Sequence, residues 1–234
     1  MGTGLAPALR PPRTLEDPLA YLPVSPISLY RRRRALYGGD EPAASLYLVI
    51  EGKVKVCRKS DNGRNVLIDI YQPDDFFGEA VFLGDGPRPE SAVALEDTRV
   101  MCWTISEIET IAVRRPALSV ALLQLLARRS WDFGARIATF AVESIPRRLA
   151  WSLLRFSEKL GQESEDGSVL MMPFTHELLS EYVGTSREIV THHMNHFRRQ
   201  GFLRYSREGI RLYREPIDTW LRHEGSAEHE PAAN

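Results

Sequence analysis

Cysteine is scarce in this sequence. Cys57 and Cys102 are its only two cysteines among 234 residues, and they lie far apart, without CxxC or metal-ligand spacing. An iron–sulfur cluster takes about four thiolates, so one subunit cannot supply them. Two isolated cysteines fit a protein of a reducing compartment.

Long apolar runs and a secretory leader are also missing. No stretch has the roughly 20 consecutive apolar residues of a membrane-spanning helix. The N-terminus lacks the pattern of a signal peptide. We therefore expect a cytoplasmic protein with no membrane partner.

The chain lacks an excess of charge of either sign. Its formal net charge is −1 and its pI is about 6.6, so a general attraction to nucleic acid is not expected. Local clusters set phosphate contacts instead. Arginines gather at Arg31–Arg34 and at Arg198 and Arg199. The place of Arg31–Arg34 before the first turn favours a solvated strand or loop over a nucleic-acid patch or a targeting signal.

Motifs of catalysis are absent as well. The sequence has no nucleophile elbow, no P-loop and no zinc motif. We therefore expect a protein that is not an enzyme.

The segment Phe174–Gly201 has the pattern of two helices joined by a tight turn. Thr175 is placed to cap the first helix, and Glu177 lies in its first turn, where the helix dipole favours an anion. Gly184 ends this helix, and Thr185–Glu188 has the capping-box pattern that starts a second one. The second helix is predicted to bury Ile189, Val190, Met194 and Phe197.

The other face of the second helix is polar. Arg, Glu and Asn side chains near a helix N-terminus suit hydrogen bonds to base edges in a major groove. An ordinary helical hairpin with a polar outer face is the alternative, because two-helix patterns are common. The DNA contacts predicted from this segment are Thr185, Ser186, Arg187, Glu188, Thr191, His192, Asn195, Arg198 and Arg199.

Two short strands around a polar turn follow, at 202–205 and 209–213. A helix-turn-helix followed by such a hairpin is a winged helix. Arginines flank the second helix and the hairpin, which favours DNA over a protein as the partner of this surface. They are Arg198, Arg199, Arg204, Arg207 and Arg211.

The N-terminal half is rich in strand patterns. Residues 1–26 are expected to be extended or disordered, because they are rich in Pro, Ala and Leu. Short apolar runs separated by turn residues then predict many strands, which is typical of a sandwich or barrel. The candidate strands are 46–50, 53–57, 66–71, 92–94 and 99–103.

A long helix is predicted over 116–144. Apolar and small residues recur on it at alternating spacings of three and four, as in a coiled-coil seam, although such stripes often pack on their own domain. Pro146 is expected to end or kink this helix, before an amphipathic helix over 147–160 and a polar loop over 161–167. The predicted dimer interface is Leu123, Leu126, Ser130, Phe133, Ile137 and Phe140.

This order of modules resembles the cyclic-AMP receptor protein/FNR family of bacterial transcription regulators. The resemblance covers about Leu29 to Tyr213 and is carried by Phe76–Glu79, by the recognition-helix start Gly184–Val190, and by turn glycines at Gly39, Gly52 and Gly78. It implies an α+β fold with a β-roll (a cyclic-nucleotide-binding-like jelly roll), a long central dimerisation helix and a C-terminal winged helix-turn-helix. The expected divisions are 1–26, a β-roll effector-type domain at 27–115, the helix at 116–145, the DNA-binding domain at 146–220 and a flexible tail at 221–234.

The resemblance also implies a homodimer that reads a pseudo-palindromic site with two recognition helices. Arg187 would bond a guanine edge and Glu188 would accept from a cytosine amine. His192 stands where members of the family often carry an arginine. An activator of this family would also contact RNA polymerase.

The effector pocket departs from the cyclic-nucleotide-binding members of the family. Gly78, Glu79, Ser91 and Ala92 match the family's phosphate-binding cassette, but Glu90 stands where the family has the arginine that pairs with the cyclic phosphate. A carboxylate repels a phosphate, and Arg88 lies between two prolines. Phe133 and Gly134 replace the polar pair that faces the purine. Cyclic AMP is therefore not expected as an effector, and a different ligand or none is expected.

No cofactor is predicted. Cys57 or Cys102 alone would suffice as an axial haem ligand, which leaves haem open, although both fall in strand patterns typical of inert buried thiols. His192 and His196 have helical i, i+4 spacing, but no carboxylate or cysteine joins them, so no metal site is expected.

The sequence thus predicts a homodimeric, sequence-specific DNA-binding regulator that does not depend on cyclic AMP. The alternative is a ligand-sensing module that acts through a protein partner, with the winged helix as its docking surface.

Overall fold

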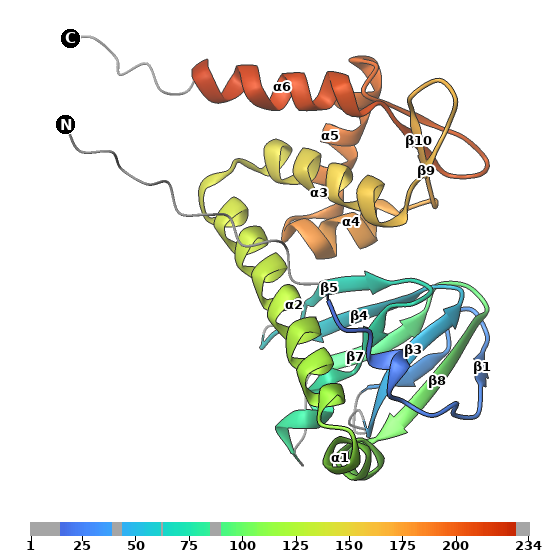
Figure 1. Ribbon diagram of the computed structural model, residues 1–234. Helices are drawn as coiled ribbons and strands as arrows, with labels where there is room; N and C mark the ends of the chain where they lie inside the picture. Colours follow the sequence, from blue (N-terminus) through green and yellow to red (C-terminus); the bar gives the residue numbers. More distant parts are fainter. Residues whose placement is uncertain (1–14, 39–43, 62, 85–89, 228–234) are drawn as a thin grey trace, which may run out of the picture.

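The structure is a computed structural model, which describes residues 15–38, 44–61, 63–84 and 90–227. It has an N-terminal β domain, a long connecting helix and a C-terminal domain of helices with a small sheet (Figure 1). Arg88 and Gly39, which the sequence singled out, lie outside the described residues.

The N-terminal domain contains two four-stranded antiparallel sheets, which confirms the predicted β-roll. One has the order β1-β8-β3-β6, from Ser28–Tyr30, Thr98–Thr104, Ser45–Glu51 and Phe76–Phe77. The other has the order β2-β7-β4-β5, from Ala35–Tyr37, Glu90–Ala94, Val54–Lys59 and Asn65–Tyr71. Between them, alternating inward residues build a core of stacked rings. Tyr47 and Phe77 lie 5.1 Å apart, and Tyr71 and Phe77 lie 5.5 Å apart.

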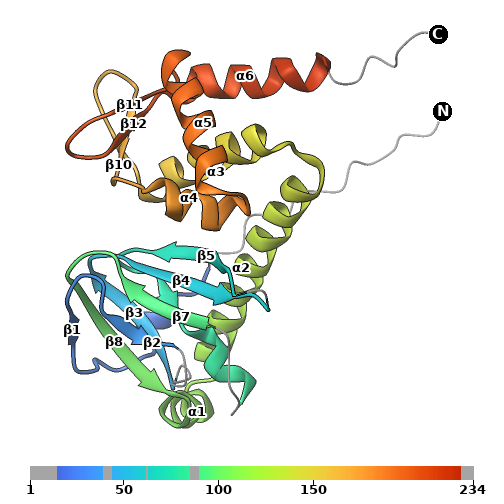
Figure 2. The ribbon, with the colours of Figure 1, turned by 180° about the vertical axis from the view of Figure 1, so that it is seen from behind.

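Two helices follow the roll. Thr104 starts α1 (Ile105–Arg114) with a complete capping box, in which Glu107 is the reciprocal partner. The central helix α2 (Ala117–Val142) runs alongside the roll from α1 to the C-terminal domain (Figures 1 and 2). It ends at Val142 because Glu143 is extended, and Pro146 occupies the first turn of α3 (Ile145–Leu160). Pro146 therefore begins the next helix, where its missing N–H costs nothing, and the prediction that it ends or kinks the long helix was wrong.

The C-terminal domain joins helices α3, α4 (His176–Val183), α5 (Arg187–Arg199) and α6 (Arg214–Ala227) to one sheet. The sheet order is β11-β12-β10-β9, from Leu203–Tyr205, Ile210–Leu212, Val169–Met171 and Gln162–Glu163. The expected loop at 161–167 thus includes a strand, and the two-stranded wing is half of a larger sheet.

Both expected flexible ends differ from the sequence prediction where they are described. Residues 221–227 belong to α6, in which Ile217 and Leu221 are buried in the core of the domain. Of the N-terminal segment, residues 15–26 include a 3₁₀ turn, Pro18–Ala20, and pack against the β domain. Leu22 is buried, and the indole N–H of Trp103 donates to the carbonyl of Pro23 at 2.9 Å. Tertiary contacts order both segments, although neither has a strong local pattern.

The two domains pack on each other directly. Leu67 and Ile70 of β5 belong to the same apolar core as the C-terminal helices. Asp69, on the same strand, is buried and accepts from Nζ of Lys159 on α3 at 2.9 Å. Arg136 of α2 donates to the carbonyl of Ile68 at 2.6 Å. These contacts fix the orientation of the helix-turn-helix relative to the roll.

Candidate nucleic-acid interface

The helix-turn-helix lies where the sequence predicted, but the cap of α5 is Ser186 and not Thr185, which a capping box over Thr185–Glu188 would use. The Thr175 hydroxyl accepts from the N–H of Leu178 at 3.1 Å and caps α4. Gly184 ends α4 in the left-handed conformation, with φ of 76°. Ser186 caps α5 by accepting from the N–H of Ile189 at 3.3 Å. These local contacts set the turn that separates the two helices.

The buried face of α5 consists of Val190, Met194 and Phe197. Ile189 was predicted to join them but is 38% exposed. Each helix position turns by about 100°, and Ile189 lies toward the polar side, so this prediction was wrong. An exposed apolar group beside the polar face is suited to contact a thymine methyl.

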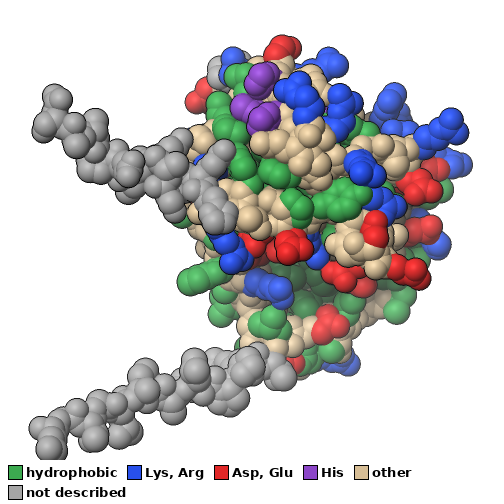
Figure 3. Space-filling view, turned by 90° about the horizontal axis from the view of Figure 1, so that it is seen from above, with side chains coloured by type: hydrophobic (Ala, Val, Ile, Leu, Met, Phe, Trp, Pro, Cys, Tyr) green, Lys and Arg blue, Asp and Glu red, His purple; other side chains and the backbone are tan. Residues whose placement is uncertain are grey.

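The outer face of α5 keeps most of the predicted polar residues accessible. Arg187, Glu188 and His192 are exposed, while Thr185 and Asn195 are half-buried. Both the Arg187 and the Glu188 side chains lie in the first turn, where a base-reading side chain projects furthest into a groove. The arginines Arg198, Arg199, Arg204 and Arg207 are exposed around them. Figure 3 shows histidine and Arg/Lys side chains side by side over this domain.

Two predicted contact residues and one of the flanking arginines are engaged inside the domain. Ser186 serves as the helix cap. The Thr191 hydroxyl lies 2.8 Å from Nδ1 of His176 and donates to the carbonyl of Arg187 at 2.8 Å. Arg211 donates to the hydroxyls of Ser164 and Ser168, at 2.9 and 2.8 Å, and so fastens β12 to the β9–β10 turn. Sequence reasoning could not detect the contact of Thr191 with His176 or those of Arg211, because their partners are distant along the chain.

The effector region of the roll already contains an internal ion pair. Glu79 and Arg129 of α2 lie 2.6 Å apart, and Arg129 also donates to the carbonyl of Phe76 at 2.5 Å. Gly78 has φ of 84°, and a Cβ there would lie 2.7 Å from the carbonyl oxygen of Ser45, so only glycine fits. This ion pair joins the cassette to the central helix without a ligand.

The C-terminal end of the cassette contributes a second carboxylate. Glu90 begins β7, and its carboxylate lies 3.6 Å from the guanidinium of Arg58. Burial raises the pKa of Tyr37 well above its ordinary value, and the nearby charges of Glu79 and Glu90 raise it further. Ser91 and Ala92 follow Glu90 on β7, and Ala92 is buried. Tyr37 lies opposite Ala92 across β2 and β7, and the charges of both Glu79 and Glu90 act on its buried phenol.

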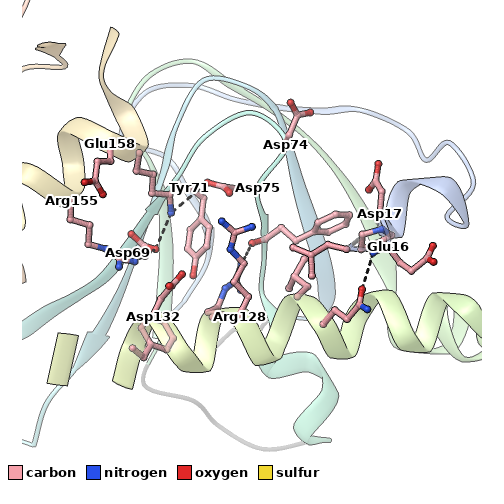
Figure 4. Close-up of a pocket in the computed structure, with 18 residues that line it drawn as sticks. Glu16, Asp17, Asp69, Tyr71, Asp74, Asp75, Arg128, Asp132, Arg155 and Glu158 are labelled. Atoms are coloured by element: carbon pink, nitrogen blue, oxygen red, sulfur yellow. Dashed lines mark hydrogen bonds and ion pairs between the residues drawn. The ribbon is translucent and has the colours of Figure 1, made fainter. Parts of the chain in front are cut away.

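A cavity of about 640 Å³ lies where the N-terminal segment, β5, α2 and α3 meet (Figure 4). Phe133 lines this cavity. Carboxylates dominate the wall, but Lys159 pairs with Asp69 at 2.9 Å and with Asp75 at 3.5 Å. The cavity lies beside the contact between the roll and α3, because Asp69 and Lys159 both line it.

The outward face of α2 is rotated relative to the predicted seam. Phe140 lies edge-on to Tyr182 of its own chain, with ring centroids 6.2 Å apart, and Leu126 is half-buried. Leu123 and Ile137 are 67% and 68% exposed, and Ser130 is exposed as well. Leu123, Ser130 and Ile137 belong to an exposed stripe of α2 whose residues recur at spacings of three and four. The stripe consists of Val120, Leu123, Ala127, Ser130, Gly134, Ile137 and Ala141.

The two cysteines lie in different sheets, on β4 and β8. Burial raises the pKa of Cys57 to about 11 and also raises the pKa of Cys102. Within the described ranges, no three His, Cys, Asp or Glu side chains are placed to hold a metal ion. None of the described helices is both long and apolar enough to cross a membrane.

Comparisons with known proteins agree with this architecture. A family model described as a cyclic nucleotide-binding domain matches residues 28–115, and one described as a Crp-like helix-turn-helix domain matches residues 147–215. The chain is 29% identical, over 77% of its length and 81% of the relative's, to a CRP-like cAMP-activated global transcriptional regulator of Mycobacterium tuberculosis.

Solved structures show the same arrangement of modules. FixK2 from Bradyrhizobium japonicum superposes with a TM-score of 0.71 at 24% identity, covering 84% of this chain and 96% of that one. TTHA1359, a transcriptional regulator of the CRP/FNR family from Thermus thermophilus, superposes with a TM-score of 0.62 at 26% identity. The superposition covers 84% of this chain and 98% of that one.

Proposed function

The chain belongs to the cyclic-AMP receptor protein/FNR family of transcription regulators, and on this basis we propose that it is a homodimer that reads a pseudo-palindromic DNA site without cyclic AMP. The observation that carries the proposal is the exposed first turn of α5. Arg187 and Glu188 are both exposed there, on a helix whose opposite face is fully buried. Such a helix presents a donor and an acceptor to base edges.

The exposed seam of α2 supports the homodimer. Its residues are apolar or small, and Gly134 has open space where a Cβ would stand. Large apolar side chains such as Leu123 and Ile137 are rarely left in water along one helical stripe, unless another surface covers them. A second copy of the same helix is complementary to it, since a two-fold axis brings the same patch together from both subunits. The seam we propose is therefore the exposed set, without Phe140.

The contacts of Glu79 and Glu90 support independence from cyclic AMP. Glu79 is paired with Arg129, so a ribose hydroxyl would have to compete with a charged partner. Glu90 would place a negative charge beside the cyclic phosphate, where repulsion in a partly buried site costs more than in water. The M. tuberculosis relative is named as cAMP-activated. We propose that this chain differs from it in that respect.

We also propose that no haem is bound through Cys57. Its thiol is buried on β4 and lies 3.9 Å from a carboxylate oxygen of Glu181, so iron would have to enter the contact between the two domains to reach the sulfur.

Selection of bound DNA from a random pool, with and without cyclic AMP, tests these proposals together. We expect the wild-type protein to enrich a two-fold symmetric sequence equally under both conditions. Arg187→Ala should lose enrichment at one symmetric pair of positions, whereas Arg31→Ala, a matched control on the far domain, should not. If the folded dimer enriched no sequence, the alternative of a protein partner would be favoured.

A further inference from the structure

One histidine joins the recognition helix to the wing. His176 is the first residue of α4, and its ring lies between α5 and β11. Its Nδ1 lies 2.8 Å from the hydroxyl of Thr191, and its Nε2 lies 2.9 Å from the hydroxyl of Tyr205. Neither neighbour is close to His176 in sequence, so this bridge exists only in the folded domain.

The hydrogens of the bridge can be assigned from its partners. The Thr191 hydroxyl donates its one hydrogen to the carbonyl of Arg187, so its oxygen accepts from the histidine. Nδ1 of His176 therefore carries the ring hydrogen in the neutral state. Nε2 is then an acceptor, and the Tyr205 hydroxyl donates to it. In the neutral state all three donors are satisfied inside the protein.

We propose that His176 is a positioning residue for DNA binding, which holds the wing against the recognition helix and makes Tyr205 a phosphate donor when its ring takes up a proton. This inference rests on the proposed DNA-binding function. It adds two residues, His176 and Tyr205, that the base-reading face of α5 does not include.

The proton changes the direction of one hydrogen bond. With a proton on Nε2, the ring donates at both nitrogens, and the Tyr205 oxygen becomes the acceptor. The Tyr205 hydrogen is then released. Tyr205 is 41% exposed on the wing strand, where its hydroxyl can donate to a phosphate oxygen of bound DNA. One proton taken up per subunit thus converts an internal donor into an external one.

The surroundings of the bridge favour the neutral form of the ring in the free protein. Burial lowers the pKa of His176, and the charge of Arg187 on α5 lowers it further. Burial raises the pKa of Tyr205, whose other charged neighbour is Arg198 on α5. The groups that face the ring are therefore Arg187 and Thr191 from α5 and Tyr205 from β11. A phosphate placed beside them adds negative charge and favours the imidazolium.

The affinity of the protein for DNA is therefore expected to depend on pH. Because DNA raises the pKa of His176, affinity should rise as the pH falls through the pKa of the bound state. It should level off below the pKa of the free state. Each unit by which DNA raises this pKa gives about a tenfold gain in affinity per subunit.

The test measures the affinity of the full-length protein for its selected DNA between about pH 5.5 and 8. The variants are His176→Gln, which cannot titrate, and Tyr205→Phe, which removes only the hydroxyl. His193→Gln is the matched control, because His193 also lies in this domain but has no part in the bridge. We expect the wild type and the control to show the same rise in DNA affinity as the pH falls. His176→Gln should lose the whole contribution of this ring to that rise, and Tyr205→Phe should lose the share that depends on the released hydroxyl.

A slope of affinity against pH that is unchanged in His176→Gln would overturn the proposal. So would a Tyr205→Phe variant that binds more weakly by the same factor at every pH, since its hydroxyl would then act independently of the ring. If His176→Gln misfolds, Tyr205→Phe alone decides between these outcomes. Failure of the wild type to bind any DNA would refute the proposed function itself. If the wild type binds DNA and its affinity depends on pH as steeply as that of the two bridge variants, only the role of the bridge is refuted.

Discussion

Replacing Asp69 with asparagine should loosen the contact between the two domains. Asp69 lies on β5 of the roll with a side chain that is only 7% exposed. It accepts from Lys159 at 2.9 Å, lies 3.7 Å from Arg155, and accepts from the N–H of Ile70 at 2.8 Å. An asparagine has nearly the same shape, so the change removes the charge while it keeps the volume.

The size of the effect follows from the burial of the cations. Breaking a fully buried ion pair by removing one partner costs about 3–5 kcal/mol. The Lys159 and Arg155 side chains are 22% and 30% exposed, and Lys159 keeps Asp75 at 3.5 Å. Water and that second carboxylate compensate part of the loss. We therefore expect Asp69→Asn to lower the free energy of unfolding by about 2 kcal/mol.

Urea denaturation at one fixed protein concentration is the assay, with the midpoint as the measured quantity. Asp97→Asn is the matched control, because Asp97 pairs with Arg31 at 2.7 Å with a side chain that is 52% exposed. Its loss should cost less than about 1 kcal/mol. Lys159→Met completes a double-mutant cycle and isolates the pairwise contribution. Equal shifts of the midpoint in Asp69→Asn and Asp97→Asn would refute a special role of the buried Asp69 carboxylate.

Three further predictions concern DNA, the dimer and the effector. Arg187→Ala should weaken binding of the selected DNA by about 1–3 kcal/mol and relax the preference at one guanine. Gel-shift titrations that show unchanged affinity and unchanged preference would contradict the role of Arg187 in reading that base. Ile137→Asp should yield monomers in sedimentation, because it places two desolvated charges on the symmetric seam. The control variant Val24→Asp changes an exposed position of the N-terminal segment and should remain dimeric. Calorimetry should detect no cyclic AMP binding tighter than about millimolar, or about −4 kcal/mol. Micromolar binding that disappears in Arg88→Ala would instead identify Arg88 as the phosphate ligand.

Local sequence was sufficient for elements that are defined by neighbouring residues. The helix-turn-helix was located correctly because Thr175 and Ser186 bond N–H groups three residues away and Gly184 takes a conformation that other residues avoid. Five of the eight strands described in the roll followed from short apolar runs between turn residues, whereas β1, β2 and β6 were not predicted. The order of the modules then indicated the family, which the comparisons confirmed.

Other features were decided only when distant segments met. The sequence indicated a seam on α2, but Phe140 turns toward Tyr182 of its own chain, because the docked C-terminal domain offers it an apolar partner. The helix α6 was missed, since its apolar residues Ile217 and Leu221 are few and become informative only when they are buried.

The bridge through His176 is the clearest example of a feature that local sequence could not predict. By itself, a histidine at the start of a helix predicts nothing. Its role depends on Thr191 and Tyr205, which lie 15 and 29 positions away and reach hydrogen-bonding distance only after α4, α5 and β11 have packed. Periodicity and capping act over a few residues and can be read from sequence, whereas the pairing of polar groups across a core depends on how whole elements are oriented.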